Sequence, residues 1–213
     1  MIVFGFCSCS SFSQSNSSKR ISADGKFVDK QIIDQVIQYY QQQNNPDSIT
    51  KEVTDTTIEV TLYIKYGSEY NYDGTIYISK MPDDYFHGDL DGDGVEEIIY
   101  SISTEGIGGG NAYWNDVFVS RLINNKYKII DAVTSNKLTG DKGAYDGGLF
   151  YPLAIQDRLI TGESICWTDE DAHCCPSLKF YTTVKFEKDK LVFNSRKSMK
   201  NISNQTSKNE IGK

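Results

Sequence analysis

The chain is poor in the features that would place it in several common protein classes. It holds only two histidines and four prolines among 213 residues. Beyond the N-terminal stretch it has no run of about 20 apolar residues, the length a helix needs to cross a bilayer. Its formal net charge is −7. No basic stripe or groove is visible either, which argues against nucleic acid as a partner.

Familiar catalytic motifs are also missing. The Gly-x-Ser-x-Gly elbow of many hydrolases does not occur. The glycine-rich segment 106–110 lacks the Lys-Ser/Thr pair of a phosphate-binding loop, so a surface loop is expected there. Carboxylate pairs are plentiful, however. A secreted hydrolase with a carboxylate acid and a carboxylate base, acting on glycan or peptide, is therefore the alternative to a non-catalytic protein.

Composition divides the chain into four segments. Residues 1–13 read as an export signal remnant or a lipoprotein signal, and residues 14–23 as a polar spacer. Residues 24–194 are expected to form a single β-rich domain, and residues 195–213 a flexible tail. A domain of this length needs no metal or disulfide merely to fold.

One helix and a series of strands are predicted within that domain. Apolar residues recur every three or four positions between Asp24 and Asn45, which predicts a helix capped by Asp24 or Asp29 and ended by Pro46. Alternating patterns then predict strands, with a turn at Tyr72–Gly74. The expected fold class is α+β, predominantly antiparallel β-sheet with one N-terminal helix. The predicted strands cover residues 57–64, 75–79, 97–103, 113–123, 127–133, 149–155, 159–167, 179–188 and 191–193.

The first residues resemble the end of a secretory signal peptide, because a short apolar run is followed by small and polar residues. Cys9 follows the small residue Ser8 and is the candidate for lipidation. Cleavage near Ser11–Ser13 is the competing interpretation, and a frayed cytoplasmic N-terminus is a third. We expect an exported protein that meets a membrane only through an N-terminal lipid anchor, if it has one.

The strongest signal is an acidic loop between His87 and Ile99. Aspartates stand at the first, third and fifth positions of a calcium-loop pattern, and Gly94 stands at the sixth, where the chain must turn. Carboxylates this close repel one another without a cation between them. We therefore expect a structural Ca²⁺, with a metal-free turn as the alternative. The predicted ligands are Asp89, Asp91, Asp93, Glu97 and the backbone carbonyl of Val95.

The loop differs from an EF-hand because its twelfth position is Tyr100 instead of a bidentate glutamate, and because strands flank it. We expect weak affinity, about 10⁻⁴–10⁻³ M or somewhat tighter. The loop resembles the strand-flanked D-x-D-x-D-G calcium loops of FG-GAP repeats. Its order with the C-C-P-S motif at residues 174–177 is similar to that in uncharacterised bacterial envelope proteins and lipoproteins. That resemblance implies export to a bacterial cell envelope, the periplasm or the medium, and no assigned chemistry.

Three cysteines lie outside the export segment, at Cys166, Cys174 and Cys175. In an oxidising compartment one disulfide from Cys166 to Cys174 or Cys175 is expected, worth about 2–3 kcal/mol for so short a loop. The alternatives are a metal site formed by Cys166, His173, Cys174 or Cys175 and an aspartate, and a cysteine nucleophile with a histidine base, for which His173 stands next to Cys174.

The sequence thus predicts an exported, non-catalytic envelope protein with a structural calcium loop. We expect it to bind an unknown protein or a glycan, because 14 tyrosines and 10 phenylalanines would suit a binding face.

Overall fold

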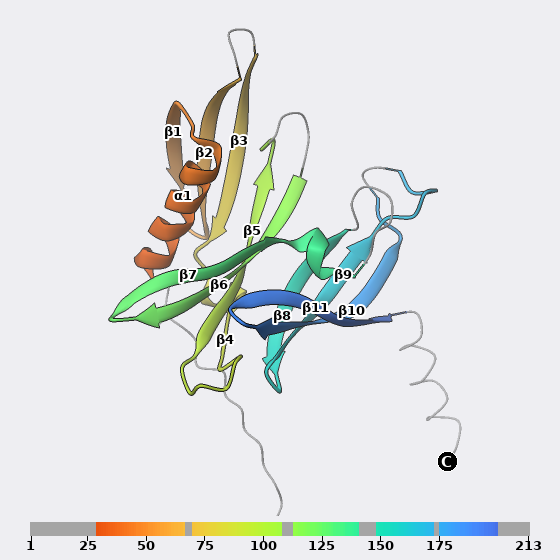
Figure 1. Cartoon of the computed structure of the whole chain (residues 1–213). Coiled ribbons are helices and arrows are strands. Elements are labelled where there is room, and N and C mark those ends of the chain that lie inside the picture. The colour runs from red at the N-terminus through yellow and green to blue at the C-terminus, as the bar shows by residue number, and fades with distance from the viewer. Residues whose placement is uncertain (1–28, 67–69, 108–112, 141–147, 173–174, 200–213) are drawn as a thin grey trace, which may run out of the picture.

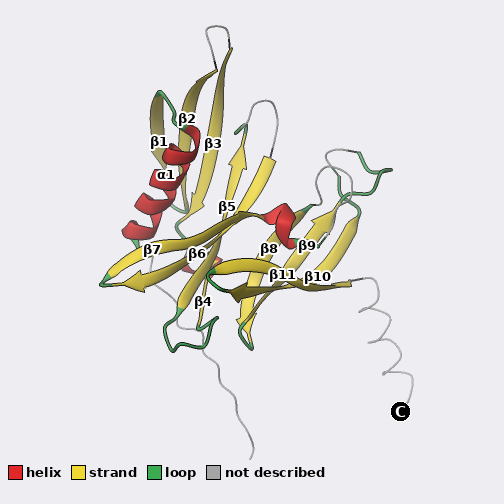
Figure 2. Ribbon diagram, in the orientation of Figure 1, coloured by secondary structure: helices red, strands yellow, loops and turns green. Residues whose placement is uncertain are grey.

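The computed structural model describes residues 29–66, 70–107, 113–140, 148–172 and 175–199 (Figure 1). The predicted export signal with Cys9, the polar spacer, His173, Cys174 and the end of the predicted tail lie outside these residues. Within them, one α-helix and eleven strands make up nearly all regular structure (Figure 2). All strand pairs are antiparallel, which confirms the predicted α+β class.

Helix α1 (Lys30–Asn44) is the N-terminal element of the described fold. The Asp29 carboxylate accepts the Gln31 N–H at 2.7 Å and so caps the first turn, as predicted for one of the two candidate caps. The helix ends at Asn45, whose φ of 44° is left-handed. Its buried face consists of residues from the predicted apolar stripe, namely Ile32, Ile33, Val36 and Tyr40.

The strands form two sheets. The first has the order β1-β2-β3-β5-β6-β7, with β4 also paired to β5, and the second has the order β11-β10-β9-β8. The first sheet contains β1 (Ser48–Val53), β2 (Thr57–Tyr66), β3 (Tyr70–Ser79), β4 (Tyr85–Gly88), β5 (Glu97–Glu105), β6 (Tyr113–Ile123) and β7 (Lys126–Thr134). The second contains β8 (Leu149–Gln156), β9 (Leu159–Cys166), β10 (Leu178–Glu187) and β11 (Lys190–Ser198).

Each face of the first sheet packs against a different layer. On one face, Tyr100 and Phe118 join the core beneath α1. On the other face, Ile99, Val117 and Val119 join a core with the second sheet. In Figure 1, helix α1 and the second sheet lie against different regions of the first sheet. Both faces of β5 and β6 are therefore covered where they cross the centre of the molecule.

The burial of β5 records how far that cover extends. Its first four residues are all buried, and burial then alternates from Ser101 onward. A strand covered on both faces is buried continuously, whereas a strand covered on one face alternates. The second sheet consequently covers only the Glu97 end of β5. Among the described residues, the second sheet therefore leaves the outer face of β3 and of the Glu105 end of β5 uncovered.

Two sequence predictions are wrong. Tyr72–Gly74 is no turn, because these residues lie inside β3. Gly74 serves close packing there, since a Cβ on it would lie 2.5 Å from the Cγ1 atom of Ile107. The flexible tail was predicted to begin at residue 195, which is too early, because strand β11 continues to Ser198.

Candidate metal centre

The acidic loop, residues 89–96, is the connection of an antiparallel hairpin. It leaves β4 after Gly88 and enters β5 at Glu97, and these two residues face each other across the strand pair. Leu90 anchors the loop, because its side chain is buried in the core between the sheets. The site is thus held by packing at one point and by the hairpin at both ends.

Aspartate side chains build the turn itself. Asp89 accepts the N–H of Gly92 at 2.6 Å and that of Gly94 at 3.2 Å through its two carboxylate oxygens. Asp91 accepts the N–H of Asp93 at 3.1 Å. Gly92 and Gly94 have φ of 83° and 87°, the left-handed region in which glycine carries no steric penalty. The D-x-D-G-D-G spacing therefore encodes a folded turn as well as a set of carboxylates.

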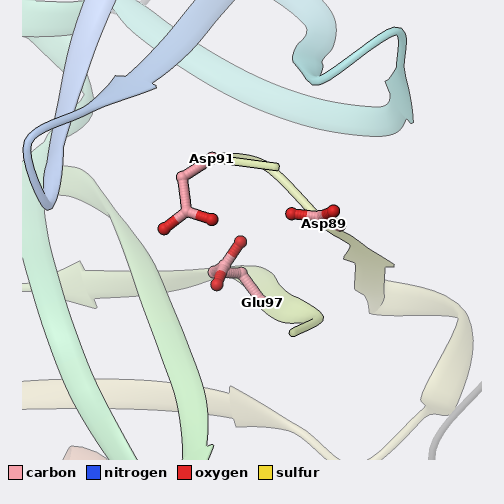
Figure 3. Close-up of side chains that lie close together, drawn as sticks. All are labelled: Asp89, Asp91 and Glu97. Atoms are coloured by element: carbon pink, nitrogen blue, oxygen red, sulfur yellow. The ribbon is translucent and has the colours of Figure 1, made fainter. Parts of the chain in front are cut away.

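Three predicted ligands come together. One carboxylate oxygen from each of Asp89, Asp91 and Glu97 lies within 4.8 Å of the others. Figure 3 shows the three side chains around one shared space, with Glu97 reaching it from β5. Asp93 is not in this group, and its carboxylate instead accepts the Val95 N–H at 2.8 Å. The side chain of Val95 is exposed, and the role of its backbone carbonyl as a ligand stays a prediction.

Sequence reasoning missed Arg121 of β6, which enters the same cluster. Its Nε donates to Glu97 at 2.6 Å and its Nη2 donates to Asp91 at 2.5 Å. Its Nη1 lies 3.3 Å from a carboxylate oxygen of Asp93. Glu97 and Arg121 face each other in the strand register, so the pairing follows from sheet geometry. The protein therefore supplies an internal cation to its own acidic loop.

A second arginine lies against the turn from the other sheet. The guanidinium of Arg158, in the β8–β9 turn, is so close to Gly92 that a Cβ there would lie 2.3 Å from Nη1. Arg121 and Arg158 thus approach the loop from the two sheets. Arg121 pairs with three carboxylates, those of Asp91, Asp93 and Glu97, whereas Arg158 lies against the backbone at Gly92.

The pKa values of Glu97 and Asp91 are shifted in opposite directions by these surroundings. Burial raises the pKa of Glu97 above its ordinary value, although the Leu90 N–H and Arg121 act in the opposite direction. Its side chain is fully buried, and Leu90 N donates to it at 2.8 Å. Partial burial also acts to raise the pKa of Asp91, but hydrogen bonds from Arg121 and Asp93 outweigh it and the pKa is lowered. Of the three carboxylates paired with Arg121, that of Glu97 is the one fully withdrawn from water.

His87, on β4 beside the loop, does not join the carboxylate group. Its side chain is 8% exposed, and its Nδ1 is 4.0 Å from Glu96. Burial lowers the pKa of His87, with Glu96 acting against that shift. Its Nε2 has no hydrogen-bond partner among the described residues. The residue belongs to the packing of β4.

The cysteine segment is only partly described. Cys166 is buried at the end of β9, Cys175 is exposed, and these two are not bonded to each other. Asp171 ties the residues on both sides of it together by accepting the N–H groups of Thr168 at 2.7 Å and Ser177 at 3.0 Å. These hydrogen bonds lower the pKa of Asp171. A disulfide from Cys166 to Cys174 stays a prediction.

Comparison with known proteins adds no relative to this picture. No family model matches the chain, and no curated protein or solved structure matches it significantly. Among the described residues, no helix is both long and apolar enough to span a membrane.

Proposed function

We propose that this chain is an exported, non-catalytic protein of a bacterial cell envelope whose acidic loop binds Ca²⁺ as a structural ion. The observation that carries the proposal is the convergence of Asp89, Asp91 and Glu97 oxygens within 4.8 Å. Hard carboxylate oxygens on a tight loop are the ligands that Ca²⁺ prefers. The biological role that we propose is to bind a partner or glycan outside the cell.

Arg121 sets the strength of the site. It pairs with Asp91 and Glu97, so Ca²⁺ must compete for oxygens that already have a cationic partner. Even with Arg158 counted, two positive charges stand against the four carboxylates of Asp89, Asp91, Asp93 and Glu97, and this surplus of negative charge still favours a divalent cation. We therefore expect weak binding, about 10⁻⁴–10⁻³ M, which suits the calcium-rich exterior better than the cytoplasm.

Thermal unfolding in EDTA, Ca²⁺ or Mg²⁺ tests the calcium site, because an ion that binds only the native state must raise the midpoint. At a Ca²⁺ concentration tenfold above Kd the gain is about 1.4 kcal/mol. That corresponds to a rise of about 3–6 °C for a domain of this size. Mg²⁺ should give less, because it demands a near-ideal octahedral site.

The Asp89→Asn variant sharpens the test. Asparagine keeps one oxygen for the turn N–H groups and removes the charge, so the Ca²⁺-induced rise should shrink. Asp189→Asn is the matched control, since Asp189 is an exposed turn residue between β10 and β11. An unchanged midpoint of the natural chain in millimolar Ca²⁺ would reduce the loop to an arginine-paired, metal-free turn.

A further inference from the structure

A groove opens where the second sheet stops covering the first. The packed region ends along β5, since Ile99 is fully buried whereas Ser101 and Ser103 are partly exposed on the same face. At this boundary β8, the edge strand of the second sheet, stands over the open outer face of β3 and β5. The resulting cavity has a volume of about 700 Å³, within the range of small-molecule sites.

The first sheet is also interrupted beneath this groove. β3 pairs with β5 from Ser103 to Glu105, and β4 pairs with it from Glu97 to Tyr100. Neither strand is in register with β5 at Ser101 and Ile102. The Ser101 hydroxyl in this gap is buried and has no hydrogen-bond partner among the described residues. The break in the sheet thus leaves one polar atom, just beneath the groove surface, without a hydrogen-bond partner among the described residues.

Hydroxyl groups and aromatic rings dominate the lining. Seven of the thirteen lining residues are serine, threonine or tyrosine, and Phe86 adds an apolar ring. Tyr77 donates to Glu105 at 3.2 Å, and Tyr113, beside the groove, donates to Ser103 at 3.0 Å. Burial, together with neighbouring Tyr113, raises the pKa of the Tyr151 hydroxyl to about 12, so it stays a neutral donor. Hydrogen bonds of their hydroxyl groups hold the rings of Tyr77, Tyr113 and Tyr151 in place.

The charges around the groove exclude one large class of ligand. Asp83 and Asp84 line it, and no lysine, arginine or histidine stands among its described lining residues. A phosphate, sulfate or uronate group would meet negative charge without a cationic partner. An uncharged ligand with many hydroxyl groups and apolar C–H faces matches the lining, because hydroxyls and carboxylates can bond its edges while rings pack on its faces.

The shape of β8 argues against a peptide that adds a strand to its edge. Pro152 removes one backbone donor, and the β8–β9 register shifts between Pro152 and Ala154. The Phe150 carbonyl is already taken, since the Asn115 side chain donates to it at 2.8 Å. A broken edge of this kind is a poor template for strand pairing.

We propose that this groove binds an uncharged oligosaccharide, with Tyr77, Tyr151 and Phe86 packing on sugar rings and the serine hydroxyls bonding their edges. The inference rests on the proposed role in binding and names its ligand class. It does not depend on the calcium loop, which shares no residue with the groove lining.

The test is a titration of the isotopically labelled full chain, followed by amide NMR shifts. The probes are chitotetraose, maltotetraose and cellotetraose at millimolar concentration, with a tetragalacturonate as the anionic control. Saturable shifts confined to the groove with at least one uncharged probe, and none with the anion, are expected. Absence of groove shifts with all three uncharged probes, or equal shifts with the anion, would overturn the proposal.

Paired variants locate the binding. Tyr77→Ala should weaken it by about 2- to 10-fold, the range expected for one aromatic contact. Tyr63→Ala should not, although Tyr63 is on the same face of neighbouring β2. Leu153→Asp, at a groove residue 53% exposed, should also weaken binding, whereas Val192→Asp on β11, 42% exposed, should not. An equal loss of oligosaccharide affinity in both variants of each pair would contradict binding in the groove.

The two proposals fail in different ways. The titration is repeated in EDTA and in Ca²⁺, and shifts of Gly92 and Gly94 report the loop while those of the groove report the sugar. Loop shifts without groove shifts would refute only the oligosaccharide site. Groove shifts without a Ca²⁺ response would refute only the calcium site. Hydrolysis of a bound oligosaccharide probe would support the groove as its binding site, but it would favour the alternative hydrolase function over the non-catalytic one.

Discussion

Arg121→Met removes the internal cation of the acidic loop while keeping the aliphatic length of the side chain. Glu97 is fully buried and would lose a partner at 2.6 Å, leaving only the Leu90 N–H. Removing one member of a buried ion pair costs about 3–5 kcal/mol. Arg121 is 17% exposed and its other partners are more exposed, so we expect the lower end, about 3 kcal/mol.

Urea unfolding at neutral pH measures this loss. With an m-value of about 2 kcal/mol per molar, the midpoint should fall by about 1.5 M with no change in m. The control is Lys185→Met, which breaks the surface pair to Glu187 and should cost less than about 1 kcal/mol. A second control is the double variant Glu97→Gln with Arg121→Met, which removes both charges and should regain most of the stability.

The sign of the pH dependence follows from Glu97. Burial has already raised its pKa, and removing Arg121 takes away a group that lowers it. A carboxyl with a raised pKa in the folded state is favoured in its protonated form. The stability difference between variant and natural chain should therefore be smallest below the ordinary glutamate pKa and grow as pH rises through the raised one.

Calcium supplies the final discriminating measurement. Without the competing guanidinium, Ca²⁺ should stabilise the Arg121→Met variant more than the natural chain. A loss below about 1 kcal/mol that is also independent of pH would refute the dependence of Glu97 on Arg121. A large loss of stability that Ca²⁺ does not reduce would support the role of the ion pair and would argue against a Ca²⁺ site in the loop.

Three further outcomes are expected. Gly94→Ala should lower stability in urea by about 1–2 kcal/mol, which is the cost of holding an alanine in the left-handed backbone region, because nothing lies within 4 Å of the added Cβ. Gly92→Ala should cost more, because the Arg158 side chain must also move away from the added Cβ. Asp131→Ala should lower thermal stability by about 1–3 kcal/mol, since it leaves the buried N–H of Leu191, now bonded at 2.8 Å, without its acceptor. Peptide mapping of the unreduced protein, purified from an oxidising compartment, should show Cys166 joined to Cys174 in the mass spectrum, and a reduced pair there would contradict the predicted disulfide.

Periodic patterns revealed most of the elements because they come from burial on one side. The α1 stripe and the alternation of β2 were readable for this reason. β1 was not, because all six of its residues are exposed and leave no pattern. β4, with four residues, is too short for one. The glycine of β3 was read as a turn because sequence does not reveal that Ile107 packs against it.

The site divides in the same way. The loop carboxylates are local in sequence, so their convergence was predictable from spacing. Arg121 lies 24 residues beyond Glu97 across strand register, and its pairing could be derived only if the length of the β5–β6 connection were known. Arg158 reaches the loop from the other sheet, and no local pattern records how two sheets pack.

The division of the chain into two sheets explains why loop and groove lie near the same strands without sharing residues. Gly88, at the end of β4, packs so closely on Ile155 of β8 that a Cβ would lie 2.8 Å from it. On one side of that contact the loop begins at Asp89; on the other side Phe86 faces the groove. Because close-packed interiors deform little, this contact between Gly88 and Ile155 holds β4 against β8 between the loop and the groove. The proposed calcium site and the proposed oligosaccharide site therefore share the β4–β8 contact as scaffold but share no side chain, so variants in one site should leave the other intact.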